Sequence, residues 1–333
     1  MKTQMIIGYL ASAAAVFIMT ALFSKLIIPK LKSLKMGQKI LDIGPRWHKN
    51  KEGTPTMGGL TFIAASVIVF AADCIIFWIR GSDIDIPKMT VCMAFALVNG
   101  LIGFIDDFAK FFKKQNQGLK AWQKFFLQLV AAGGFLIVMT SLGYITDAVY
   151  LPYFDITIKL GPAYYILMLV LITGIINSVN LTDGIDGLAS SVTFVVAGFF
   201  SVAAFSVMNL SEALMSALVV GSTLGFLVYN FHPAKIFMGD TGSLFLGGMV
   251  VSLAFMINDP LILIPVGVIY ICESLSDIIQ VLYFKVSGGK RFFKMAPIHH
   301  HFEKCGWSEN TIVLVFSLVT LAFCVLGYFG IQN

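Results

Sequence analysis

The stretch Met57–Ile79, MGGLTFIAASVIVFAADCIIFWI, carries a single charged side chain, Asp73. A run this long and apolar is typical of a helix that crosses a lipid bilayer, which needs about 20 residues. The 333-residue chain as a whole is 58% hydrophobic and only 12% charged, whereas soluble proteins are roughly 25% charged. This composition excludes a soluble globular enzyme, a nucleic-acid-binding protein and a disordered chain, and it indicates an integral membrane protein.

Further runs of this kind predict an all-α polytopic bundle that forms one membrane domain over residues 1–333. We expect about ten transmembrane helices, at Met5–Phe23, Met57–Ile79, Met89–Phe104, Phe125–Leu142, Tyr164–Val179, Leu188–Val207, Ala213–Val228, Leu244–Ile257, Leu261–Phe284 and Thr311–Ile331. The ninth run ends in a stretch that contains Lys and Gly, which predicts that this helix is broken and leaves the bundle. The pairs Gly58-Gly59, Gly133-Gly134 and Gly247-Gly248 predict close helix packing.

The distribution of positive charge predicts the orientation of the bundle. Lys and Arg concentrate in the cytoplasmic loops of membrane proteins. Only Lys2 precedes the first run, whereas five lysines follow it between positions 25 and 39, so we expect the N-terminus outside. With ten spans both termini lie outside, and all but four of the 23 Lys and Arg residues then fall on the cytoplasmic side. The external stretch 144–160, with Thr, Tyr, Val and Ile around Pro152, predicts a small β-hairpin.

The unusual polar residues collect in the loops predicted to be cytoplasmic. Five carboxylates and three histidines follow the third, fifth, seventh and ninth spans: Asp106, Asp107, Asp183, Asp186, Asp240 and His299–His301. Because these loops meet at one membrane face, we expect a single active site built from loops 30–56, 105–124, 180–187, 230–243 and 285–309.

Some of these residues also fit a structural role. Asp186 and Asp240 each precede an apolar run, where an acid is a common helix N-cap. Asp106 and Asp107 lie instead at the C-terminal end of a span, where the helix dipole disfavours anions. Adjacent carboxylates there repel one another unless a cation joins them. For this pair we therefore favour a functional role.

Oxygen ligands of this kind suit Mg²⁺ or Mn²⁺. Nearby lysines supply positive charge for a polyanionic substrate, or hold anionic lipid headgroups. For Lys110, four residues after Asp106, we favour a role in the site. The histidine tract fits either a metal site or hydrogen bonds to phosphate and sugar.

In these motifs the chain resembles the polyprenyl-phosphate N-acetylhexosamine 1-phosphate transferases, and among them the phospho-N-acetylmuramoyl-pentapeptide transferase family. The matching blocks are Gly44-Pro45 with His48, Gly53–Gly59, Asp106-Asp107, Asn177–Gly187, Pro233–Gly248 and Gly289–Trp307. The G-T-P-T-M-G-G and H-H-H-F-E stretches favour the muramoyl-pentapeptide branch. Three positions depart from the family pattern: Leu41 is usually Arg, Phe108 usually Tyr, and Asp277 usually apolar.

The resemblance implies a multi-pass enzyme of the bacterial cytoplasmic membrane. It would transfer phospho-MurNAc-pentapeptide from UDP-MurNAc-pentapeptide to undecaprenyl phosphate, giving lipid I and UMP with Mg²⁺ in peptidoglycan synthesis. Asp240 is then the principal Mg²⁺ ligand, and Asp106, Asp107, Lys110 and His299 are catalytic. The implied substrate-binding residues are Lys124, Asn180, Asp183, Ile185, Asn230, Phe237, Gln280, His300 and His301. The lipid is expected in a groove near the ninth span, and the family is often dimeric.

Alternatives stay open at this point. One is a UDP-GlcNAc:polyprenyl-phosphate GlcNAc-1-phosphate transferase. Another is a transporter, which would place ionisable residues near the bilayer midplane. In this chain only three acids lie within the apolar runs: Asp73, Glu273 and Asp277. For the reaction itself, direct attack by the lipid phosphate is our hypothesis. Its rival is a covalent phospho-aspartyl intermediate on Asp106 or Asp107.

Overall fold

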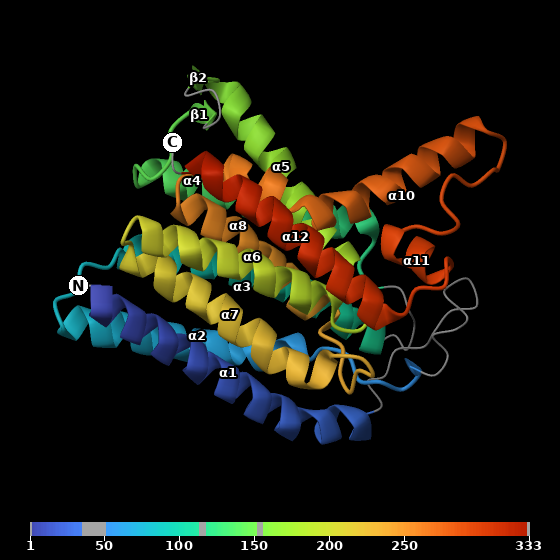
Figure 1. Cartoon of the computed structure of the whole chain (residues 1–333), viewed down its shortest axis with the longest axis horizontal. Helices are drawn as coiled ribbons and strands as arrows, with labels where there is room; N and C mark the ends of the chain where they lie inside the picture. Colours follow the sequence, from blue (N-terminus) through green and yellow to red (C-terminus); the bar gives the residue numbers. More distant parts are fainter. Residues whose placement is uncertain (1, 35–50, 113–117, 152–155, 332–333) are drawn as a thin grey trace.

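The computed structural model describes residues 2–34, 51–112, 118–151 and 156–331, and it is a helical bundle with one small sheet (Figure 1). Within these ranges nine helices are long and apolar enough to cross a membrane, and a bent helix pair raises the number to ten. The prediction of an all-α membrane protein with about ten spans is confirmed. Leu41, Gly44-Pro45 and His48 lie outside the described residues.

Most helices begin and end within a few residues of the apolar runs, whereas the first and third extend well beyond the runs that predicted them. The long helices are α1 (Lys2–Ser33), α2 (Gly59–Ile79), α3 (Ile86–Phe112), α4 (Ala121–Ser141), α5 (Pro162–Thr182), α6 (Leu188–Ser206), α7 (Leu210–Asn230), α8 (Gly239–Met256), α10 (Val268–Val286) and α12 (Glu309–Ile331). The short ones are η3 (Pro260–Ile262), α9 (Leu263–Val266) and α11 (Ile298–Glu303).

Helix α3 continues past the apolar run that predicted it. Residues 105–112, expected in a loop, extend the helix to Phe112. Two contacts at helical spacing stabilise this extension. The rings of Phe104, Phe108 and Phe112 stack with centroids 5.9 and 6.2 Å apart, and Lys110 pairs with Asp106 at 2.6 Å. The acid pair therefore projects from a helix rather than from a loop.

Glycines bring the backbones of the central helices together. A Cβ at Gly248 of α8 would lie 2.8 Å from the Cα of Ala96 on α3, and one at Gly247 would lie 2.9 Å from the Cα of Ile176 on α5. The close packing predicted for this pair is confirmed, and α8 is almost wholly buried between its neighbours. The prediction was wrong for Gly133 and Gly134, because an added Cβ meets nothing within 4 Å at either position.

The predicted ninth span is indeed broken, although at its start. Helices α9 and α10 meet at Gly267 with a bend of 77°. Pro260 and Pro265 precede this bend, and proline cannot donate a backbone hydrogen bond to continue a helix. Helix α10 then projects away from the bundle (Figure 1). Along it Ile278, Leu282 and Val286 are exposed by 53%, 58% and 83%, a surface suited to lipid rather than water.

The predicted hairpin is also present. Strands β1 (Ala148–Leu151) and β2 (Ile156–Lys159) are antiparallel, with Ala148 opposite Lys159. The hairpin lies at the end of the bundle where α1 begins and α12 ends, opposite α11 (Figure 1). The start of α1 and the end of α12 thus share one end of the bundle (Figure 1).

We predict that Gly103→Ala separates α3 from α8. The added methyl group would collide with the backbone carbonyl of Asp240, so one helix must shift. We expect the free energy of unfolding to fall by about 1–3 kcal/mol, the usual cost of overpacking, seen as a lower midpoint of thermal unfolding in detergent. Gly174→Ala is the matched control, since a Cβ there meets nothing within 4 Å. Equal midpoints for the two variants would contradict the close contact.

Candidate active site

Three carboxylates meet where the last turns of α3 reach the first turn of α8. Asp106, Asp107 and Asp240 each place an oxygen within 4.8 Å of the others. Asp106 and Asp107 are buried, and Asp240 is partly buried. Gly239 enters α8 at a φ of +69°, and a Cβ there would lie 2.5 Å from Oδ2 of Asp107. A glycine is therefore needed for the backbone to turn so close to the acid.

Asp107 serves the N-terminus of α8. Its Oδ2 accepts hydrogen bonds from the backbone N–H of Thr241 at 2.9 Å and from the Thr241 hydroxyl at 2.7 Å. The positive end of the α8 dipole thus offsets the unfavourable place of this acid near the end of α3. Asp240 does not cap the helix, because Met238 is the N-cap residue and Asp240 lies in the first turn. The capping role considered for Asp240 belongs to Asp107.

Two lysines balance the three acids. The Nζ of Lys110 lies 2.6 Å from both Asp106 Oδ2 and Asp240 Oδ2, and 3.7 Å from Asp107 Oδ1. Lys124 reaches in from α4, with its Nζ 3.4 Å from Asp240 Oδ2. The two ammonium groups thus offset the repulsion between the neighbouring carboxylates.

Asn180, near the end of α5, orients Asp240. Its Nδ2 donates to Asp240 Oδ1 and to Ser243 Oγ, each at 2.7 Å, and its Oδ1 accepts from Lys124 at 3.0 Å. Six of the residues that the sequence singled out are thus joined in one network. Its carboxylate oxygens are hard donors that fit a divalent cation such as Mg²⁺.

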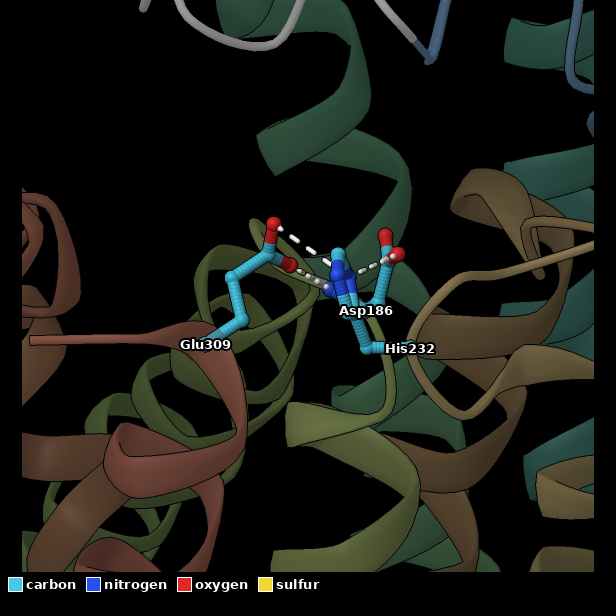
Figure 2. A group of neighbouring side chains, drawn as sticks. All are labelled: Asp186, His232 and Glu309. Carbon is cyan, nitrogen blue, oxygen red and sulfur yellow. Dashed lines mark hydrogen bonds and ion pairs between the residues drawn. The ribbon is translucent and has the colours of Figure 1, made fainter.

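A second cluster joins Asp186, His232 and Glu309 (Figure 2). His232 Nδ1 lies 2.9 Å from Asp186 Oδ2, and Ala234 N–H donates to the same oxygen at 2.9 Å. Lys51 places its ammonium between the two acids, 2.7 Å from Asp186 Oδ1 and 2.6 Å from Glu309 Oε2. The cluster therefore contains its own cation.

This cluster corrects the capping role considered for Asp186. Gly187, not Asp186, is the N-cap residue of α6, and the Asp186 carboxylate points to Lys51 and His232 instead. Sequence reasoning missed Lys51, His232 and Glu309. The available signal was weak: Lys51 lies just before the G-T-P-T segment, and Glu309 is an acid beside the start of the last apolar run.

The three histidines have three different partners. His299 Nδ1 lies 2.9 Å from Glu273 Oε2, and His300 Nδ1 lies 2.6 Å from Glu303 Oε2. His301 Nδ1 accepts a hydrogen bond from the backbone N–H of Lys294 at 3.1 Å. Since the three Nδ1 atoms have three different partners, they do not converge on one small ion.

Most of the remaining predicted residues make hydrogen bonds to loop segments of the chain. Asn230 Nδ2 donates to the Ile236 carbonyl at 3.0 Å, and Gln280 Oε1 accepts from the Phe293 N–H at 2.9 Å. Phe237 is paired through its backbone with the first loop, donating to the Pro55 carbonyl at 2.8 Å. Ile185 is buried in the turn between α5 and α6.

Two sequence patterns match ranges that include the three clustered carboxylates and Lys51. The model of glycosyl transferase family 4 matches residues 89–258, and phospho-N-acetylmuramoyl-pentapeptide-transferase signature 1 matches residues 51–63. A phospho-N-acetylmuramoyl-pentapeptide-transferase of Clostridium perfringens (strain 13 / Type A) is 42% identical over 312 residues, covering 94% of this chain and 95% of the relative. The chain belongs to the phospho-N-acetylmuramoyl-pentapeptide-transferase family.

Other members of this family match over the same length. The transferase of Clostridium botulinum (strain Eklund 17B / Type B) is 45% identical over 318 residues, covering 95% of this chain and 94% of the relative. That of Bacillus cytotoxicus is 42% identical over 325 residues, covering 97% and 98%. The predicted resemblance is confirmed, and the chain is a phosphoglycosyl transferase rather than a transporter.

Asp183 gives a pH-dependent prediction. Burial, together with the nearby Asp240, Asp107 and Asp186, raises the pKa of its carboxyl well above the usual range, and Lys51 opposes this only in part. An acid with a raised pKa binds its proton more tightly in the folded state. The folded protein therefore loses stability as the pH rises from the ordinary pKa of Asp through the raised one.

Asp183→Asn removes this loss. We expect the variant to unfold at a higher temperature than the parent protein at neutral pH, and the difference to shrink as the pH approaches about 4, the ordinary pKa of aspartate. Thermal unfolding in detergent over this pH range measures the effect. Asp83→Asn, at an exposed position, is the control and should show no such trend. A pH-independent difference for Asp183→Asn would argue against the raised pKa.

Proposed function

We propose that this enzyme transfers phospho-MurNAc-pentapeptide from UDP-MurNAc-pentapeptide to undecaprenyl phosphate, forming lipid I and UMP at the cytoplasmic face of a bacterial inner membrane. The observation that carries the proposal is the network of three carboxylates and two lysines at the junction of α3 and α8. The names of the relatives supply the reaction type. A soluble donor and a membrane-bound acceptor meet only at a membrane surface, where the positive loops predict this site to be.

The network suits a divalent cation, for which we propose Mg²⁺. Asp240 would be its principal ligand, with Asp106 and Asp107 beside it, because their oxygens converge and contain no soft donor. When bound, such an ion neutralises developing charge on the phosphate oxygens and makes UMP a better leaving group. Lys110 and Lys124 would then hold the pyrophosphate, since phosphoryl transfer depends mainly on positioning and charge neutralisation.

Direct attack by the lipid phosphate fits the hydrogen bonds of the acid pair better than a covalent intermediate does. Asp106 Oδ1 accepts from the Leu119 N–H at 2.7 Å, and its Oδ2 pairs with Lys110. Asp107 Oδ2 is occupied by Thr241. These three oxygens are therefore weak nucleophiles, whereas Asp107 Oδ1 has only Lys110 at 3.7 Å. A phosphate with a second pKa near 6 needs little help from a base.

The roles that we propose for the other predicted residues follow from the resemblance to the family. We assign the nucleoside to the side of the site formed by Asn180, Asp183, Ile185, Asn230, Phe237 and Gln280. His299, His300 and His301 would face the sugar or peptide. The exposed apolar surface of α10 at Ile278, Leu282 and Val286 supports a lipid chain lying along that helix.

The choice of donor is the first test of this function. We expect the purified protein, given undecaprenyl phosphate and Mg²⁺ in detergent, to release UMP from UDP-MurNAc-pentapeptide and not from UDP-GlcNAc. Release with the second donor only would move the enzyme to the GlcNAc branch. Absence of UMP with both donors, from a protein shown to be folded, would refute the proposal.

Asp240→Asn tests the metal. We expect kcat for UMP release to fall by about 10²–10³-fold, the usual loss when one electrostatic group is removed from a transition state, because the amide binds Mg²⁺ poorly. Raising the Mg²⁺ concentration should recover part of the activity. Asp147→Asn, next to the external hairpin, should keep the parental rate at every Mg²⁺ concentration. Full activity of Asp240→Asn at low Mg²⁺ would remove this residue from the metal site.

A further inference from the structure

Glu273 is a carboxylate inside a membrane-crossing segment, on the second turn of α10, and its side chain is fully buried. An isolated charge in such a place is very unfavourable, so it requires a partner. The partner is His299 of α11, whose Nδ1 lies 2.9 Å from Glu273 Oε2 and whose ring is also fully buried. The contact joins the projecting helix to the histidine tract, 26 residues further along the chain.

Each residue of the Glu273–His299 pair has one further polar atom that the contact does not use. Glu273 Oε1 and His299 Nε2 are both buried, and neither finds a hydrogen-bond partner among the described residues. His299 Nε2 faces the turn between α5 and α6: a Cβ added to Gly184 would collide with it. This turn contains Asp183 and Ile185, which we place beside the nucleoside. The glycine lets the imidazole approach the turn, and Glu273 fixes the ring from behind.

We propose that Glu273 is a positioning residue for the transfer reaction, acting through His299. A carboxylate accepts hydrogen bonds and cannot donate one, so it fixes the proton of His299 on Nδ1 and turns Nε2 toward the Asp183–Asp186 turn. The arrangement resembles the carboxylate that orients a histidine in metal sites and catalytic triads. This inference rests on the proposed function, because it assigns His299 to the substrate side of that same site.

The contact with His299 explains why Glu273 lies in an apolar span. Asp73, a second buried acid in the spans, accepts a hydrogen bond from Ser12 at 2.8 Å, between α2 and α1. That contact joins α1 to α2, and neither of its two residues is close in sequence to a proposed site residue. Glu273 instead contacts a proposed catalytic residue. Asp73 is therefore a matched control: a buried span acid with one partner and no place in the site.

Glu273→Gln is the decisive substitution, because glutamine keeps the size of the side chain but can donate as well as accept. We expect kcat for UMP release to fall by about 10–100-fold, the usual effect of losing a supporting contact of this kind, with KM nearly unchanged. Asp73→Asn should keep the parental kcat. In a His299→Ala background, Glu273→Gln should cause no further loss, since its effect passes through the imidazole. Multiplying losses in the double variant would overturn the proposal.

A spectroscopic measurement decides the same point without turnover. The chain has five histidines, so the ring signals of His299 in ¹⁵N-histidine-labelled protein can be assigned by their absence from His299→Ala. We expect the Nδ1-protonated form in the parent and a changed ratio of protonated forms in Glu273→Gln. Identical spectra would refute the positioning role. If the parent releases no UMP while the spectra change as expected, the proposed function fails and the Glu273–His299 contact stands.

Discussion

Three carboxylates can share one small space only if a donor or a positive charge faces each of them. In this fold each compensating group comes from a different helix: Lys110 from α3 itself, Lys124 from α4, Asn180 from α5 and the first turn of α8 through Thr241. The charge balance therefore depends on how four helices meet. Glycines at 103 and 239 allow that meeting, because they bring backbone to within contact of the acids.

Much of this architecture could be predicted from the sequence, since the bilayer imposes strong rules. Length and apolarity predicted the spans, and turn residues between β-branched ones predicted the hairpin at 144–160. The meeting of Asp106, Asp107 and Asp240 could also be anticipated, because the loops after alternate spans must lie at one face of the membrane. These inferences need only the local composition and the fact that alternate loops lie on the same side of a membrane.

What could not be predicted depends on partners far away in the chain. The sequence around Asp186 has the form of a helix cap, and only the positions of Lys51 and His232 show that its carboxylate serves another purpose. Gly133-Gly134 and Gly247-Gly248 look alike in sequence, yet only the second pair has helices pressed against it. The bend at Gly267 and the Glu273–His299 contact likewise depend on where α10 leaves the bundle.

The ion pairs of Lys51 with Asp186 and Glu309 connect the beginning of the chain with its end. A ribosome delivers these three residues to the membrane in that order, and Glu309 lies at the start of the last helix. A chain cut short before α12 lacks that acid altogether. The cluster is thus complete only when α12 packs beside the segments that carry Lys51 and Asp186.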